Sequence, residues 1–219
     1  MAKVEFIGHS CFQISFSPSK DETVRVLIDP FDDSIGLAMP SLSAEIVLIT
    51  HNHSDHNNIK RVKGSPFLVS GAGEYEIKKI FIEGISSFHD DSEGKERGGN
   101  TIYTIEGENI RFCHLGDLGQ KQLSEEQLEK IGIVDVLMIP VGGTYTIDAL
   151  SAQKIISQIE PKIVIPMHYA VPNLKIKLDR VENFLKAFGK SQLVPHDKLV
   201  VKAGSLPEDE MEIVLLKTS

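Results

Sequence analysis

Four side chains that bind metal ions well are concentrated in one short motif, His51-x-His53-x-Asp55-His56. The motif follows the apolar residues 46–49, a run typical of a strand buried on both faces. In extended backbone, residues two apart project to the same side, so His51 and His53 can hold one ion together. Asp55 and His56 lie past the bend and would face a second ion, and two-metal sites hold their ions about 3.5–4 Å apart. The spacing therefore predicts a two-metal site.

Four ligands cannot complete two coordination shells, so this hypothesis requires more ligands at other strand ends. Three candidates each lie at the C-terminal edge of a predicted strand, namely His89, Asp117 and His168. The alternative is a solvated polar loop in which Asp55 caps a helix. That alternative gives no reason for three histidines in one short motif, so we favour metal binding.

The elements that must position these residues follow an α/β pattern. A β-meander covers residues 3–7, 11–16 and 23–28, and turn-forming residues separate the later predicted strands. Apolar periodicity and capping residues predict helices over residues 124–131, 148–159 and 181–188. Such alternation of strands and helices is typical of a layered α/β sandwich. The polar segment 90–100 is expected to be a mobile surface loop that carries function.

Composition narrows the class of protein. A chain of 219 residues fits one domain, which we assign to residues 1–219. Its formal net charge of −8 disfavours binding to nucleic acid, and its two cysteines do not form a disulfide scaffold. The apolar runs are too short to span a membrane, and no secretion signal is apparent. We therefore expect a cytoplasmic protein.

The ordered motifs resemble those of the metallo-β-lactamase fold superfamily over nearly the whole chain. Three further segments resemble the compact metal-dependent hydrolases related to the ascorbate-6-phosphate lactonase group. These segments are Gly8-His9-Ser10-Cys11-Phe12, His114-Leu115-Gly116-Asp117 and Pro166-Met167-His168-Tyr169. The resemblance implies a four-layered αββα sandwich of the metallo-β-lactamase type.

The resemblance also implies a role for each candidate ligand. It assigns His51, His53 and His89 to the first ion, Asp55, His56 and His168 to the second, and Asp117 to a position bridging both. A hydroxide would complete the bridge. Asp29 matches the first motif of the family, where a carboxylate supports the site by orienting the ligand histidines.

These assignments lead to an expected chemistry. The two ions would lower the pKa of a bridging water, and the resulting hydroxide would attack a carbonyl carbon or a phosphorus atom. Zn²⁺ is our first choice, and Mn²⁺, Fe²⁺ and Ni²⁺ also suit such ligands. The expected substrate is a small ester, lactone or phosphodiester, and it could be anionic. The alternatives are a nuclease acting on RNA, an iron-dependent redox enzyme of the same superfamily and, as the weakest, a metal-binding module without activity.

Several residues keep two interpretations. His114 could compete with His89 for a metal, or it could have a supporting or substrate-facing catalytic role. His9, in a tight turn, is either a structural hydrogen-bonding residue or a catalytic residue that binds substrate or donates a proton. Arg97 is either solvated or pairs with a carboxylate or phosphate of the substrate, and Tyr145 could also reach substrate. An exposed edge formed by the tail strands could pair copies of the chain into a homo-oligomer.

Overall fold

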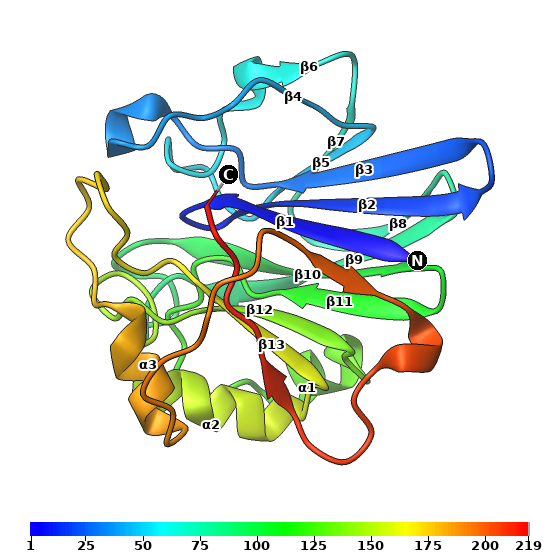
Figure 1. Cartoon of the computed structure of the whole chain (residues 1–219). Coiled ribbons are helices and arrows are strands. Elements are labelled where there is room, and N and C mark those ends of the chain that lie inside the picture. The colour runs from blue at the N-terminus through cyan, green and yellow to red at the C-terminus, as the bar shows by residue number, and fades with distance from the viewer. Residues whose placement is uncertain (219) are drawn as a thin grey trace.

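Two β-sheets packed face to face form the centre of the molecule (Figure 1). The structure is a computed structural model that describes residues 1–218. The six-stranded sheet has the order β14 (Leu199–Val201), β1 (Ala2–Gly8), β2 (Cys11–Ser19), β3 (Glu22–Ile28), β5 (Ile46–Ile49) and β7 (Phe67–Ser70). The seven-stranded sheet has the order β15 (Glu212–Ile213), β13 (Ile163–Met167), β12 (Val136–Pro140), β11 (Ile110–His114), β10 (Gly99–Gly107), β9 (Ile80–Phe88) and β8 (Gly73–Ile77).

The main hydrophobic core fills the space between the two sheets. Alternate residues of β1 and β2 face inward, and the tilted rings of Phe6 and Phe12 pack there with centroids 4.8 Å apart. Phe16 on β2 meets Phe112 on β11 edge to face, with centroids 5.7 Å apart. The aromatic pair thus joins the first sheet to the second, and the strand ends on both sheets are held at fixed positions.

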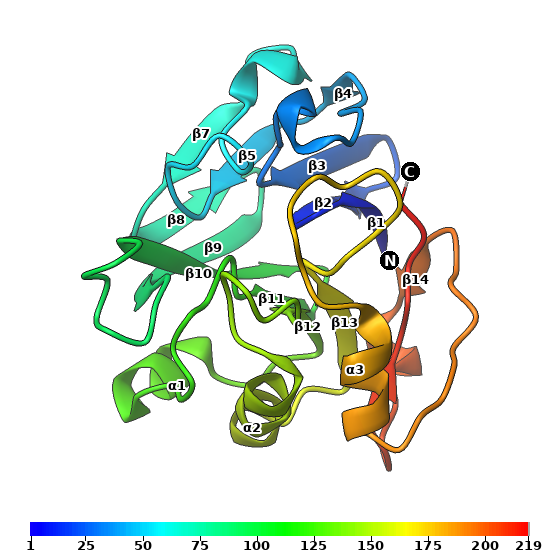
Figure 2. The same cartoon turned by 90° about the vertical axis from the view of Figure 1, so that its left-hand side faces the viewer.

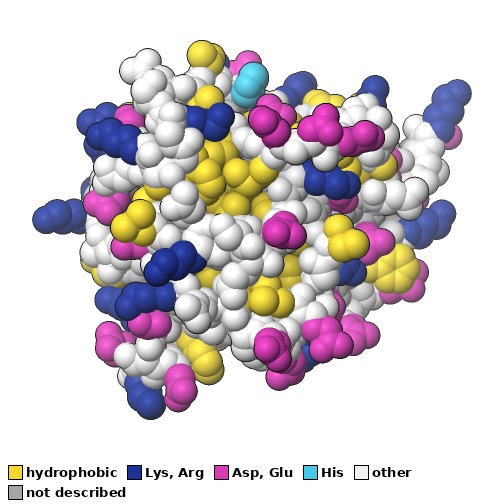
Figure 3. Space-filling model, turned by 90° about the horizontal axis from the view of Figure 1, so that it is seen from below, with side chains coloured by type: hydrophobic (Ala, Val, Ile, Leu, Met, Phe, Trp, Pro, Cys, Tyr) yellow, Lys and Arg dark blue, Asp and Glu magenta, His cyan; other side chains and the backbone are white. Residues whose placement is uncertain are grey.

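Three α-helices cover the outer face of the seven-stranded sheet (Figures 1 and 2). They are α1 (Glu125–Ile131), α2 (Ala149–Ile159) and α3 (Val181–Ala187). The predicted capping box of α1 is present, since the Ser124 hydroxyl accepts from the Gln127 N–H and the Gln127 side chain accepts from the Ser124 N–H. Figure 3 shows one face of the molecule, on which acidic, basic and hydrophobic side chains are interspersed.

The outer face of the six-stranded sheet is covered differently. Two short 3-10 turns, η1 (Asp33–Ile35) and η2 (Ile59–Arg61), lie there with the small sheet of β4 (Leu42–Ser43) and β6 (Val62–Lys63). Ile35 and Met39 pack with Leu27 and Val47 in a second, smaller core. The αββα sandwich is confirmed, and the layer on this side is made of short turns and strands.

The segment between β9 and β10 is folded around one carboxylate. Asp90 accepts hydrogen bonds from the backbone N–H groups of Ser92, Gly94, Glu96 and Arg97 at 2.8–3.1 Å. The sequence predicts a mobile polar loop here. In the structure, four backbone donors converge on the buried Asp90 side chain and give the loop a defined shape. Its mobility stays a prediction.

Within residues 1–218, the structure contains no helix that combines the length and the apolar character needed to cross a bilayer. The expectations of a cytoplasmic location, of one domain over the whole chain and of a homo-oligomer stay predictions.

Candidate metal centre

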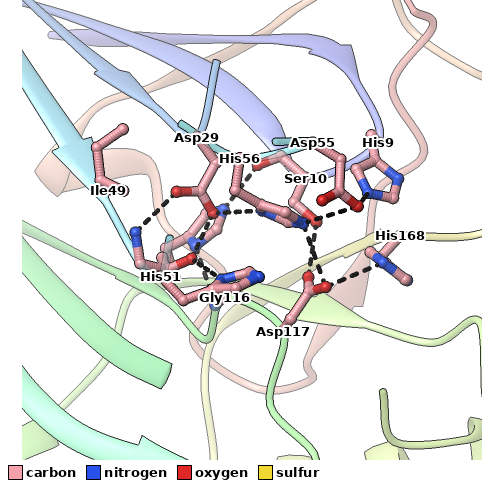
Figure 4. A network of polar contacts seen from close by, with 12 residues as sticks. His9, Ser10, Asp29, Ile49, His51, Asp55, His56, Gly116, Asp117 and His168 are labelled. Atoms are coloured by element: carbon pink, nitrogen blue, oxygen red, sulfur yellow. Dashed lines mark hydrogen bonds and ion pairs between the residues drawn. The ribbon is translucent and has the colours of Figure 1, made fainter. Parts of the chain in front are cut away.

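The candidate ligands meet at one edge of the sandwich, where strands of both sheets end (Figure 4). His51 follows β5 of the first sheet, whereas His89 and His168 follow β9 and β13 of the second. Asp117 comes three residues after the end of β11. Because the carboxyl ends of parallel strands share an edge, residues far apart in the sequence converge there.

The first group of ligand candidates consists of His51, His53 and His89. One ring nitrogen from each lies within 4.8 Å of the other two. The Nδ1 atom of His51 is 2.9 Å from the Thr50 hydroxyl, while its buried Nε2 has no hydrogen-bond partner within residues 1–218. A buried polar atom without a partner is costly, so the free Nε2 is explained well by a metal ligand role.

The second group is arranged around the carboxylate of Asp117. Its Oδ2 lies 3.2 Å from Nε2 of His56 and 3.1 Å from Nε2 of His168. The same oxygen is 3.5 Å from Nε2 of His89, which belongs to the first group. Asp117 therefore stands between the two groups of histidines, the position that a bridging ligand would occupy.

Asp55 contacts the second group through two imidazoles. Its Oδ2 lies 3.2 Å from Nε2 of His9 and 3.7 Å from Nε2 of His56. A nitrogen of His9 also lies within 4.8 Å of ligand nitrogens of His56 and His168. The structure thus places His9 in the candidate metal centre, next to the carboxylate of Asp55.

The local backbone at the start of the chain explains how His9 reaches the site. His9 has a left-handed backbone with φ of +56° between β1 and β2, and its carbonyl accepts from the His168 N–H at 2.8 Å. Few residues other than glycine adopt this conformation without strain, and such strain clusters at functional sites. The turn between the first two strands is therefore fixed directly to a candidate ligand.

Asp29 supports the site from behind. Its Oδ2 accepts from the Thr50 hydroxyl at 2.7 Å and from Nδ1 of His56 at 3.0 Å. When the proton of His56 is on Nδ1 alone, its Nε2 is free to bind a metal ion. This arrangement agrees with the supporting role that the family resemblance implies for Asp29.

His114 lies outside the group that can hold a metal. It is fully buried, its Nδ1 accepts from the Gly116 N–H at 3.1 Å, and its Nε2 donates to the Ser10 carbonyl at 2.9 Å. Both nitrogens are bound to backbone, so the structure gives His114 neither a metal nor a substrate to contact, in contrast to the catalytic role expected from the sequence. Strand alternation could have predicted this burial of His114, because residues two apart on a strand share a face and Phe112 belongs to the core.

Charge interactions set the protonation of these groups in the metal-free protein. Burial, together with the nearby His56, lowers the pKa of His51 to about 3, so this ring is neutral at physiological pH. Burial would also lower the pKa of His56, but the carboxylates of Asp117 and Asp29 outweigh it and raise that pKa well above 6.5. Despite its burial, Asp117 has a pKa well below 3.8 because of His168 and His56. The nitrogen and carboxylate donors fit divalent transition ions.

Sequence reasoning did not identify three supporting residues. The Ser10 hydroxyl lies 3.3 Å from Oδ1 of Asp117, and the Asn100 side chain accepts from the backbone N–H of Asp117 at 2.9 Å. Thr50 links Asp29 to His51 through its hydroxyl. Ser, Thr and Asn are common throughout any chain, so only the fold reveals that these three surround the site.

Comparisons with known proteins agree with this geometry. The family model of the beta-lactamase superfamily domain matches residues 3–168, which include every candidate ligand. The chain belongs to the metallo-β-lactamase superfamily. It is similar to a metal-dependent hydrolase of Thermococcus onnurineus, with 31% identity over 77% of this chain and 85% of the relative. A metal-dependent hydrolase of Pyrococcus horikoshii is 29% identical over the same shares of the two chains.

Solved structures of the superfamily share the fold. A protein of Thermotoga maritima, described as a Zn-dependent hydrolase of the metallo-β-lactamase superfamily, is 34% identical with a TM-score of 0.77, and 99% of each chain is covered. A metallo hydrolase of Ignicoccus hospitalis shares the fold with a TM-score of 0.64 and 20% identity over 92% of this chain and 99% of that chain. The superfamily member described here is a metal-dependent hydrolase.

Proposed function

We propose that this hydrolase acts on a small ester, lactone or phosphodiester with two divalent ions held by seven residues. The first ion would be held by His51, His53 and His89, and the second by Asp55, His56 and His168, with Asp117 shared between them. The observation that carries this proposal is the position of Asp117 Oδ2, which lies 3.1–3.5 Å from nitrogens of His56, His89 and His168. One carboxylate oxygen is thus placed between the two histidine groups.

The donor set supports Zn²⁺ first and Mn²⁺ second, because imidazole suits zinc and carboxylates suit manganese as well. When bound, two such ions supply a water acidified to near neutrality and polarise the substrate oxygen. Nothing in this choice depends on a redox change of the metal.

The residues of the chain would orient the reacting groups. Asp29 fixes the His56 ring and Thr50 fixes the His51 ring, so both present Nε2 to the site. Asp55 is partly exposed, and its Oδ2 lies 3.2 Å from Nε2 of His9. This carboxylate is placed to accept a proton from an attacking water, and the adjacent His9 ring orients it.

The test is hydrolysis by protein loaded with Zn²⁺ or Mn²⁺, measured on neutral esters, lactones and a phosphodiester. We expect activity on at least one class, loss of at least about a hundredfold in Asp117→Asn, and loss on chelation. His196→Ala is the matched control, because His196 is exposed and lies outside the centre. Full activity of Asp117→Asn, or of the metal-free protein, would overturn the proposal.

A further inference from the structure

The candidate metal centre opens into a cavity of about 750 Å³. Its lining combines His53, Asp55 and Asp117 of the metal centre with Arg97 and Lys175. Small-molecule sites have volumes of roughly 300–1,000 Å³, so the cavity matches a small molecule in size. A substrate placed at the metal centre would therefore share one cavity with these two cations.

The lining of the cavity contains three basic side chains. Arg97, Lys175 and Lys177 all line the cavity, and we name these three residues the basic rim. Within residues 1–218, the only carboxylates that line the cavity are Asp55 and Asp117, which belong to the metal centre. A local concentration of cations is notable in a chain of net charge −8, because it creates a field that attracts anions to this opening.

Arg97 is held at the cavity by its backbone. Asp90 accepts from the Arg97 N–H at 2.8 Å, and the guanidinium carbon lies 5.6 Å from the centre of the Tyr145 ring. Its one ion pair within residues 1–218 is a long contact of 3.9 Å to Glu96. The guanidinium therefore keeps donors free for a carboxylate or phosphate, which it can bind in a bidentate manner.

The two lysines come from the segment between β13 and α3, shown in yellow beside the loops of the first sheet in Figure 2. Leu174 and Ile176 pack against the smaller core, and the Lys175 N–H donates to the Ile35 carbonyl at 2.7 Å. Leu174 and Ile176 alternate along the chain with Lys175 and Lys177. Because the two apolar side chains are anchored in the smaller core, the two lysines line the cavity. Neither lysine forms an ion pair within the described part of the chain.

We infer that the basic rim selects substrates that carry a carboxylate or phosphate group in addition to the bond that is cleaved. This inference rests on the proposed function, because it assumes that the cleaved bond lies at the metal centre. The anionic group would bind Arg97 and the two lysines, and the Tyr145 ring would cover the part of the substrate between them. Three cations that line one cavity, of which only Arg97 has an ion pair within residues 1–218, carry the inference.

The test uses three 4-nitrophenyl esters with matched acyl chains and the protein loaded with Zn²⁺. Propionate gives a neutral ester, succinate adds a carboxylate, and 3-phosphonopropionate adds a phosphonate. We expect kcat/KM for at least one charged ester to exceed that of the neutral ester by about tenfold or more, which corresponds to about 1.4 kcal/mol. The relative rates of the two charged esters show whether a carboxylate or a phosphate is preferred.

The variant Arg97→Met/Lys175→Met/Lys177→Met should lower the charged-to-neutral ratio of kcat/KM about tenfold. Lys95→Met is the matched control, because Lys95 is an exposed cation of the same loop that does not line the cavity. It should leave the ratio unchanged. A wild-type ratio near one, or an unchanged ratio in the triple variant, would overturn the inference while hydrolysis of the neutral ester still supports the proposed function.

If none of the three esters is cleaved, these esters are not substrates. A measurement of anion binding then tests the basic rim without any reaction. Isothermal calorimetry with succinamate, 3-phosphonopropionamide and neutral propionamide measures anion binding without any reaction. Binding of at least one anionic amide that is lost in the triple variant upholds the rim as an anion site. Equal binding by the wild type and the triple variant, or no preference over propionamide, overturns it.

Discussion

Asp29 and His56 form a buried pair in which the carboxylate Oδ2 accepts from the imidazole Nδ1 across 3.0 Å. Both side chains are fully shielded from solvent. The bond determines which nitrogen of His56 faces Asp117, so Asp29, which is not itself a candidate ligand, controls the orientation of a candidate ligand.

Replacing this carboxylate should weaken metal binding. Asp29→Asn retains the shape of the side chain but removes the charge that fixes the His56 tautomer, and loss of such a partner costs about 10–100-fold in metal affinity. Competition with a chromogenic chelator measures this affinity. A Zn²⁺ affinity equal to that of the wild type would show that the pair has no role in metal binding.

The protonation of His56 should differ from that of His51 in the metal-free protein. Asp117 and Asp29 raise the pKa of His56 well above 6.5 despite its burial, whereas burial lowers that of His51 to about 3. At pH 7, ¹⁵N chemical shifts should show an imidazolium for His56 and a neutral ring for His51. Two rings that both titrate near pH 6.5 would contradict this prediction.

The sign of the pH effects follows from the raised pKa of His56. Its protonated ring stabilises the metal-free fold fully below about pH 6.5, and this stabilisation is lost as the pH rises through the raised pKa. A metal ion must displace the same proton, so metal affinity should increase with pH. Chelator competition at pH 6 and pH 8 measures this directly, and stronger binding at pH 6 would be inconsistent with it.

His114 should affect stability more than metal content. His114→Ala leaves the Gly116 N–H and the Ser10 carbonyl buried without a partner, which costs roughly 1–3 kcal/mol for each unsatisfied group. Urea denaturation should show a lower free energy of unfolding, while elemental analysis of the folded variant finds the wild-type metal content. If His114→Ala kept its full stability but lost a metal ion, His114 would have to be a metal ligand.

Asp90 should control the shape of the loop that carries Arg97. Asp90→Ala removes the acceptor for four backbone N–H groups, so the amides of Ser92, Gly94, Glu96 and Arg97 should exchange faster with solvent. Hydrogen exchange measured by mass spectrometry reports on the segment, and Asp91→Ala serves as the control for a change of charge. Unchanged exchange in Asp90→Ala would show that the loop is held by other contacts.

The sequence was sufficient to predict the sandwich, the strand ends and the local motif, because hydrophobic periodicity and ligand spacing are local signals. The bridging position of Asp117 was implied by the family resemblance alone. Local signals could not give it, because it depends on how β5, β9 and β13 meet. His114 shows the opposite case, since a histidine close to Asp117 in sequence is turned into the core by strand alternation. Lys175 and Lys177 escaped prediction because solvated lysines are ordinary in a polar loop.

The most direct test of the account is a crystal structure of the Zn²⁺-loaded protein with anomalous difference maps at the zinc absorption edge. We predict two peaks about 3.5–4 Å apart, one beside His51, His53 and His89 and the other beside Asp55, His56 and His168, with Asp117 between them. A single peak, or two peaks away from Asp117, would contradict the account.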